Sequence, residues 1–395
     1  MIRLMAWNIQ RFSTETLYRV WNGSSAYIVD TVCAVDQGSG VDIFSLIEVQ
    51  TDRNRDEGWL ITGGGKTGVL DLLGKLREVN DNWCVVPPVL LNNAQGSTYS
   101  EGIAVFFRND RVKFVGPNYF KGENKASVDF PPQHQYPYPQ DWQGALPDAI
   151  QYAPRVVSLN AEGDFLQSRR GMHATYFHDR KADRTLRLFS VHLTPGDGEP
   201  TQRELGRALG HSEFVDLKGA DVAVLAGDVN FSTTKKNLSL HEEGCSFKGF
   251  RQVPDYRENP TMVETVDNAT LAQGLCCESW TGAGKLYRYQ MSLSGGKGPG
   301  GKRKREQLMP GYLDNAYVRY APGRTPPGDF RPRVVDRVRG IPGYPTAMFQ
   351  DIATLEELFP DPDEQKDEFQ NGRNYGSIGP NPGVSDHLPI VIDIP

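Results

Sequence analysis

This sequence predicts an α/β protein, in which layers of sheet and helix alternate. Short apolar runs typical of buried strands occur along the chain between segments whose apolar residues recur at helical spacing. One unit is complete: an apolar strand at 185–193, a helix expected at 201–217 and a second apolar strand at 222–226. A strand–helix–strand unit of this kind is typical of α/β layering.

The composition is that of a globular protein and sets limits on its function. The 395 residues are 38% hydrophobic and 23% charged, with a net charge of −6, so a nucleic-acid partner would need a local basic surface. Five irregularly spaced cysteines show no zinc motif and indicate reduced thiols. The chain shows no secretory leader and no membrane-spanning apolar run, so we expect a cytoplasmic protein without stable membrane association, although export without a signal is compatible with these features.

The first 108 residues are expected to alternate between strands and helices. The predicted strands span 2–9, 41–49, 83–91 and 101–108, and the predicted helices span 24–35 and 68–79. Asn8 and Glu48 lie at the ends of the first two strands, and Glu101 opens the fourth. A buried glutamate is costly unless it is paired or bound to a metal, which makes Glu48 a candidate ligand. The alternatives are a turn asparagine at Asn8 and solvated strand ends at Glu48 and Glu101.

Polar residues also mark strand ends in the second half. A hairpin is predicted from strands at 170–177 and 185–193, and His192 lies at the end of its second strand, where a structural histidine is the alternative. The buried strand at 222–226 is broken by Gly227 and followed by Asp228 and Asn230. Their spacing of two directs both side chains the same way if the extended backbone persists, and an Asx turn is the alternative.

Two further strands complete the expected core. A strand at 312–320 carries Asp314 near its start, and the final strand, at 384–394, opens with Asp386 and His387. Because the polar candidates run from Asn8 to His387, we expect a single domain over residues 1–395 with one site assembled from both ends of the chain.

Three segments rich in proline, glycine or charge are predicted to be loop insertions, near 110–165, 235–308 and 322–380. The first contains an aromatic and proline-rich stretch at 130–142 that could touch a membrane. The second contains four consecutive basic residues, Lys302, Arg303, Lys304 and Arg305. This basic run suits a polyanion such as DNA, and a solvated loop is the alternative.

Together these side chains fit metal-assisted hydrolysis of a phosphate ester. Carboxylates with side-chain amides suit Mg²⁺, with Mn²⁺ or Ca²⁺ as alternatives, whereas the thiolates or histidine triad of a zinc site are missing. Two histidines accompanied by further carboxylates suit proton transfer. An arginine, Arg170, can grip a phosphate oxygen.

Four motifs carry a resemblance to a known family: WNIQ at 7–10, the Glu48 strand, GDVN at 227–230 and SDH at 385–387. In this combination the chain resembles the endonuclease/exonuclease/phosphatase superfamily. Glu101 in YSEGIAVFFR, Arg170 in RGMHATYF and His192 in VHLTP are similar to its deoxyribonuclease I-like branch. The resemblance implies a four-layer sandwich of two face-to-face mixed sheets flanked by helices.

The resemblance also implies roles for the candidate residues. Glu48 would be the principal metal ligand, with Asn8 beside it and Asp386 as a further ligand or a partner of His387. Asp228 and Asn230 would hold the attacking water and the phosphate, with Arg170 as a further phosphate ligand. One histidine of the pairs His192–Glu101 and His387–Asp314 would activate water, and the other would protonate the leaving oxygen.

The predicted function is therefore that of a Mg²⁺-dependent endonuclease acting on DNA. The alternatives are a sphingomyelinase-like phosphodiesterase of lipid or inositol headgroups, RNA as the substrate, and an inactive binding module. Unlike secreted deoxyribonuclease I, this chain shows neither a signal peptide nor paired cysteines. The three insertions have no counterpart there either, so substrate recognition is expected to differ.

Overall fold

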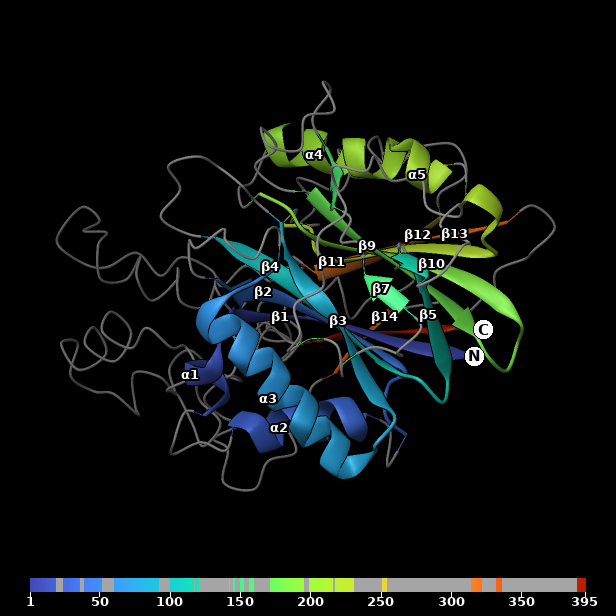
Figure 1. Ribbon diagram of the computed structural model, residues 1–395. Coiled ribbons are helices and arrows are strands. Elements are labelled where there is room, and N and C mark those ends of the chain that lie inside the picture. Colours follow the sequence, from blue (N-terminus) through green and yellow to red (C-terminus); the bar gives the residue numbers. More distant parts are fainter. Residues whose placement is uncertain are drawn as a thin grey trace, which may run out of the picture.

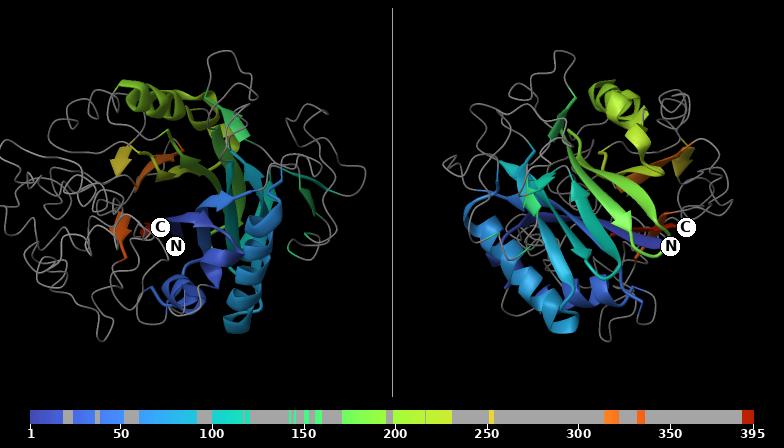
Figure 2. Two further views of the ribbon diagram at one scale, coloured as in Figure 1. Left: turned by 90° about the vertical axis from the view of Figure 1, so that its left-hand side faces the viewer. Right: turned by 45° about the vertical axis from the view of Figure 1, so that its right-hand side comes forward.

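The computed structural model shows two β-sheets packed face to face, with helices on both outer faces (Figures 1 and 2). The structure describes residues 1–18, 24–35, 39–51, 60–91, 100–116, 118–120, 142, 145, 150–152, 156–159, 171–194, 199–215, 217–230, 251–253, 314–321, 332–335 and 389–395. This arrangement confirms the predicted α/β class and the four-layer sandwich. A single domain over the whole chain stays a prediction.

The first sheet has six strands in the order β14-β15-β1-β2-β4-β3. Its central strands β1 and β2 are parallel, and the remaining pairs are antiparallel. The two chain ends meet in this sheet, since Ile2 pairs with Ile394 (Figure 1). The bounds are β1 (Ile2–Phe12), β2 (Ile43–Gln50), β3 (Trp83–Leu90), β4 (Glu101–Arg108), β14 (Pro332–Val334) and β15 (Ile390–Ile394).

The second sheet has seven strands, six in the order β12-β13-β11-β10-β9-β5, with β8 also paired to β9. Here β10 and β11 are the parallel pair. The bounds are β5 (Val112–Gly116), β8 (Val156–Ser158), β9 (Gly171–Asp179), β10 (Arg184–His192), β11 (Val222–Asp228), β12 (Arg251–Val253) and β13 (Asp314–Tyr320). A separate two-stranded sheet joins β6 (Asn118–Phe120) to β7 (Ile150–Tyr152).

The helices divide between the two outer faces. Those covering the first sheet are α1 (Thr14–Leu17), α2 (Ser24–Cys33) and α3 (Gly63–Val79), and those covering the second are α4 (Glu199–Gly210) and α5 (Ser212–Val215), followed by the short helix η5 (Leu217–Gly219) (Figure 1). Aromatic side chains fill the space between the sheets: Phe107 of β4 contacts Phe177 of β9, with ring centroids 5.4 Å apart. On the outer face of the second sheet, Phe214 of α5 packs on Phe189 of β10.

Helix α3 begins earlier than the predicted residue 68. Its first turn contains three glycines, and helix propensity alone disfavours helix there. Packing decides the outcome: a Cβ at Gly65 would lie 1.7 Å from the carbonyl oxygen of Gln50. The missing side chain lets the helix lie directly against the end of β2, and the close contact extends the helix to Gly63.

The single helix predicted at 201–217 is two helices. Helix α4 ends at Gly210, and His211 begins the next element, because its Nδ1 accepts a hydrogen bond from the backbone N–H of Glu213 at 3.2 Å. A side-chain acceptor at this position satisfies a donor that helix starts leave unpaired.

The three predicted insertions are not loops throughout. Strands β5 and β8 from the first insertion join the second sheet, β12 pairs with β13, and β14 pairs with β15. Trp142, expected in a loop that could touch a membrane, is instead fully buried in the main core. Sequence patterning missed these strands because three to five residues carry too little periodicity.

Candidate functional site

Six polar side chains meet at one end of the sandwich because of the strand directions. Each sheet has a central parallel pair whose carboxyl ends lie at this edge, and the antiparallel neighbours β4 and β13 begin there. The parallel strands bring Asn8, Glu48, His192 and Asp228, and the antiparallel strands bring Glu101 and Asp314. In the second sheet, Asp228 lies opposite both His192 and Asp314 in register.

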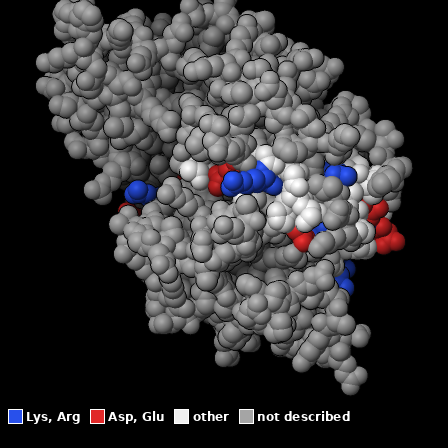
Figure 3. All heavy atoms as spheres, turned by 90° about the horizontal axis from the view of Figure 1, so that it is seen from above, with Lys and Arg blue, Asp and Glu red and all other residues white. Residues whose placement is uncertain are grey.

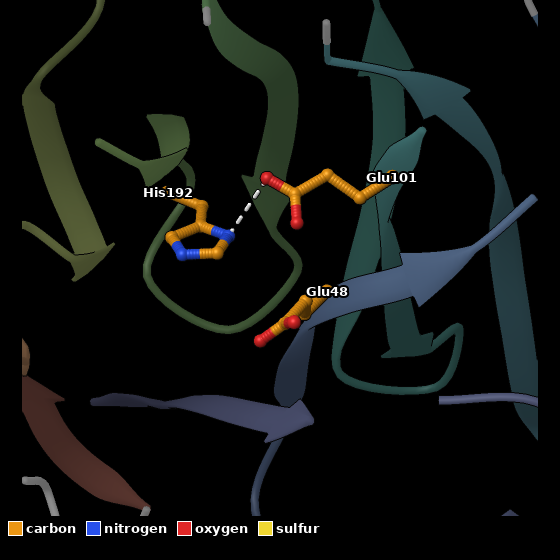
Figure 4. Close-up of side chains that lie close together, drawn as sticks. All are labelled: Glu48, Glu101 and His192. Atoms are coloured by element: carbon orange, nitrogen blue, oxygen red, sulfur yellow. Dashed lines mark ion pairs between the residues drawn. The ribbon is translucent and has the colours of Figure 1, made fainter. Parts of the chain in front are cut away.

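Glu101 and His192 form an ion pair across the two sheets. The His192 Nδ1 lies 2.9 Å from Glu101 Oε1, as the dashed line in Figure 4 shows. Glu101 is 0% exposed and His192 is 5% exposed, so Glu101 is not a solvated strand start. A buried carboxylate facing an imidazole fixes the ring orientation and places its other nitrogen toward the site.

Asp228 lies on the other side of the imidazole. Its Oδ2 is 3.4 Å from His192 Nε2 and accepts a 2.9 Å hydrogen bond from the side-chain amide of Asn8. Its Oδ1 accepts a 2.9 Å hydrogen bond from the backbone N–H of Asn230. Asp228 is therefore held by Asn8 of the first sheet and by the backbone just after its own strand, and its buried carboxylate is fixed in direction.

Glu48 reaches this site through a β-bulge. The pairing of β2 with β4 shifts register between Ile47 and Val49, and the intervening Glu48 has a φ of 68°. The left-handed region is unusual for glutamate, and such conformations concentrate at functional sites. The bulge turns the Glu48 side chain toward the space beside Glu101 and His192 (Figure 4).

The donor set fits a divalent cation. One ligand atom each from Glu48, Glu101 and His192 lies within 4.8 Å of the others. Two carboxylates with a single imidazole are donors that Mg²⁺ and Mn²⁺ accept, whereas structural zinc sites use more thiolate or histidine ligands.

The backbone at the end of β11 and just beyond it departs from the predicted extended course. Gly227 has a φ of 142°, and a Cβ there would lie 2.2 Å from the carbonyl oxygen of Val191, so only glycine fits. Asn230 has a φ of 51°, and its amide nitrogen donates to the carbonyl oxygen of Leu193 at 2.8 Å. The extended backbone does not persist, and Asn230 is directed partly toward the backbone that follows His192.

Seven predicted site residues lie outside the described residues. They are Arg170, Lys302, Arg303, Lys304, Arg305, Asp386 and His387. Asp314, the expected partner of His387, is described and is 3% exposed at the start of β13. The Asp314–His387 pair and the phosphate contacts of the basic residues stay predictions.

Contacts that support the site were missed at the level of sequence. The Ser45 hydroxyl of β2 donates to the Ser190 hydroxyl of β10 at 2.8 Å, which links the strand of Glu48 to the strand of His192. Glu204 of α4 accepts a hydrogen bond from the backbone of Thr194. For the Ser45–Ser190 contact, a serine inside an apolar strand was the only signal in the sequence. For the Glu204–Thr194 contact, no local pattern of residues gave a signal.

The fold and the site together define a class: an α/β sandwich whose facing sheets present acids, an imidazole and an amide at one edge. No family model matches the sequence, and no curated protein matches it. In the described part of the chain, no helix has the length and apolar character needed to cross a membrane.

Solved structures similar to this chain include members of the endonuclease/exonuclease/phosphatase family. One such protein, from Leptotrichia buccalis C-1013-b, aligns over 100% of both chains at 12% identity, with a TM-score of 0.46. The human Nocturnin catalytic domain, with bound sulfate, aligns over 100% of this chain and 94% of its own at 14% identity and a TM-score of 0.42. TDP2 from D. rerio, complexed with a single-stranded DNA product, aligns over 99% and 97% at 12% identity and a TM-score of 0.43.

Proposed function

We propose that this protein is a divalent-cation-dependent phosphodiesterase that hydrolyses DNA. The observation that carries the proposal is that Glu48 lies beside the buried Glu101–His192 pair, with one ligand atom from each of the three residues within 4.8 Å of the others. The buried Asp228 beside them adds a fixed acceptor for a water molecule. Acids, an imidazole and donors for a cation are the groups that hydrolysis of a phosphate ester requires.

Glu48 would hold the cation, with Asn8 and Asp386 as further ligands. A bound divalent cation supplies Lewis acidity at a phosphoryl oxygen. Asn8 uses its amide nitrogen on Asp228, so its carbonyl oxygen is the atom that can face the cation. The bulge at Glu48 brings the carboxylate to this position.

His192 would move a proton at Nε2, because its Nδ1 is held by Glu101 at 2.9 Å. Asp228 would orient the water or accept a hydrogen bond from the imidazole. Asn230 would contact the phosphate through the amide hydrogen that it does not donate to the Leu193 carbonyl. His387 with Asp314 would handle the proton on the other side of phosphorus, and Arg170 would grip a non-bridging oxygen.

DNA is the proposed substrate because of the basic run at 302–305. Four adjacent cations can contact successive phosphates of a polyanion. On the described surface seen from above, both signs of charge occur side by side (Figure 3). Changing all four basic residues to alanine should lower the log–log salt slope of binding by up to about 4.

The test incubates the purified chain and Mg²⁺ in parallel with supercoiled plasmid, RNA, and vesicles that contain sphingomyelin or phosphoinositide. The proposal predicts plasmid cleavage by the wild type and its loss in Glu48→Gln. Turnover of vesicles alone would assign the site to lipid headgroups, and turnover of RNA alone would assign it to RNA. Binding of plasmid without any cleavage would make the chain a binding module.

A further inference from the structure

A carboxylate on the outer helix layer holds the chain immediately after His192. The backbone N–H of Thr194 donates to Glu204 Oε2 at 2.7 Å, and the Thr194 hydroxyl donates to Glu204 Oε1 at 3.3 Å. Glu204 lies on α4 and is half-buried. Both of its oxygens are therefore used on one residue, two positions after the imidazole.

The same segment is fastened from the sheet side. The backbone N–H of Leu193 donates to the Asp228 carbonyl at 2.8 Å, and the Leu193 carbonyl accepts from the Asn230 amide at 2.8 Å. Strand β10 ends at His192, so regular pairing no longer fixes the following backbone. Glu204 supplies the attachment from the opposite side.

We propose that Glu204 is a positioning residue for His192. It fixes the backbone of Thr194 between the helix layer and the second sheet, and this sets the place of the imidazole between Glu101 and Asp228. The kinetic part of this inference rests on the proposed function, because turnover is the quantity that the imidazole position controls. The structural part concerns only the His192–Glu101 contact.

Small displacements matter at this position. The Glu101 contact at Nδ1 measures 2.9 Å and the Asp228 contact at Nε2 measures 3.4 Å, so the ring is placed by two partners on opposite sides. A shift of about 1 Å in a reacting group can cost on the order of 10²-fold in rate. The loss of Glu204 leaves the backbone after His192 held from the sheet side alone, and we expect the ring then to sample positions away from both acids.

The test compares Glu204→Ala with Glu204→Gln. Alanine removes both acceptors, and we expect kcat to fall about 10- to 100-fold while KM changes by less than about 2-fold. Glutamine accepts from the Thr194 N–H with its amide oxygen and donates to the Thr194 hydroxyl with its amide nitrogen. Glu204→Gln should therefore restore most of kcat.

Glu213→Gln is the matched control. Glu213 lies on the neighbouring helix α5, is 4% exposed and pairs with the buried Arg187, so its loss also loosens the helix layer. This control should lower Tm more than Glu204→Ala does, and turnover per folded molecule should stay near wild type. If Glu204→Ala leaves turnover per folded molecule unchanged, or lowers it no more than Glu213→Gln does, the positioning role is overturned.

An activity-free readout separates this inference from the proposed function. The Nδ1 proton of His192 faces a fully buried carboxylate and should exchange slowly enough to give an NMR signal, which His192→Ala identifies among the seven histidines. The signal should be sharp in the wild type, Glu213→Gln and Glu204→Gln, and broadened in Glu204→Ala. A sharp signal in Glu204→Ala would overturn the inference even if the protein hydrolyses DNA. Broadening in a protein without phosphodiesterase activity would retain the positioning role and refute only the proposed function.

Discussion

The two ends of the β-sandwich both hold buried or half-buried acids, but they balance the charge in different ways. At the end where β1, β2 and β10 begin, arginines pair with aspartates. The pairs of this arginine-paired end are Arg3–Asp393 at 2.7 Å, Arg111–Asp42 at 3.0 Å and Arg184–Asp179 at 3.3 Å. The hydrogen bond and charge of Asp42 raise the pKa of Arg111, which keeps the guanidinium charged.

At the site end, Glu48, Glu101, Asp228 and Asp314 converge from four strands. Glu101 and Asp228 are contacted there by His192 and by the Asn8 amide, groups without a permanent positive charge. Crowded acids repel one another, and a cation relieves this repulsion. The comparison teaches that arginines balance the acids at one end of the sandwich, whereas the other end gathers acids that a divalent cation would balance under the proposed function.

Removal of the divalent cation should have the largest effect. Chelation with EDTA should reduce hydrolysis by about 10³-fold or more, because a bound metal supplies several kcal/mol of charge stabilisation in the transition state. Mg²⁺ should also raise the Tm of the wild type and of Asp42→Asn, but not that of Glu48→Gln, because a ligand stabilises only a state that binds it. Full activity in EDTA would contradict the contrast between the two ends.

Loss of the imidazole comes next. His192→Ala should lower kcat by about 10²–10⁴-fold, the usual range for a positioned acid or base. Glu101→Gln should lower kcat by less, because it only weakens the orientation of His192. If His192→Ala lowers thermal stability while turnover per folded molecule stays near wild type, His192 is a structural residue that fills a strand end.

The double variant of His192 and His387 tests whether the two histidines act together. With both changed to alanine, the loss in kcat should be smaller than the product of the two single losses, because groups that act in one step are non-additive. Fully multiplicative losses would mean that the two side chains contribute independently.

At the arginine-paired end, the expected effect is on stability alone. Asp42 is 5% exposed and accepts hydrogen bonds from the backbone N–H of Arg3 and from Arg111 Nε. Asp42→Asn should lower the free energy of unfolding by about 1–3 kcal/mol, because it weakens charge-assisted hydrogen bonds. Turnover of the folded fraction should be unchanged. Denaturant unfolding and kinetics on one preparation measure both, and a loss of turnover would show that the two ends are coupled.

The pH dependence of stability separates a buried histidine of β9 from the acids of the arginine-paired end. Burial lowers the pKa of His173, on β9 opposite Ser190, from 6.5 to about 3. Below pH 6.5 the unfolded chain binds a proton on His173 that the folded chain does not bind. The free energy of unfolding should therefore fall by about 1.4 kcal/mol per unit as the pH is lowered from 6.5 to about 3. This amounts to about 2 kcal/mol at pH 5, and His173→Gln should flatten the profile there.

Asp179 of the arginine-paired end acts in a separate pH window. Burial works to raise its pKa, but hydrogen bonds from the backbone of Lys181 and Ala182 and the charge of Arg184 lower it below the ordinary 3.8. A lowered carboxylate pKa gives stability that is present above 3.8 and lost only as the pH falls further. A loss of stability between pH 6 and 5 that persists in His173→Gln would assign the acid sensitivity to another group.

Local periodicity was sufficient to predict most of the core. The β10–α4–β11 unit and the helix at 24–35 could be predicted because their apolar residues recur at the spacing of a strand or a helix. Glu48 stood out because a glutamate at the end of an apolar strand is costly to bury without a partner. Asn8, Glu101 and Asp228 stood out because they lie at the predicted ends of apolar strands. These signals depend on neighbours in sequence, which is why they need no tertiary information.

The tertiary structure decided the contacts between distant segments. The Glu101–His192 pair joins strands of different sheets, and the Asn8–Asp228 hydrogen bond spans 220 positions of the sequence. The bulge at Glu48 arises because the pairing of β2 with β4 shifts register there. Glu204 reaches Thr194 only because α4 packs on the second sheet. Strand order and sheet packing set these distances, and both depend on contacts between segments that are far apart in the sequence.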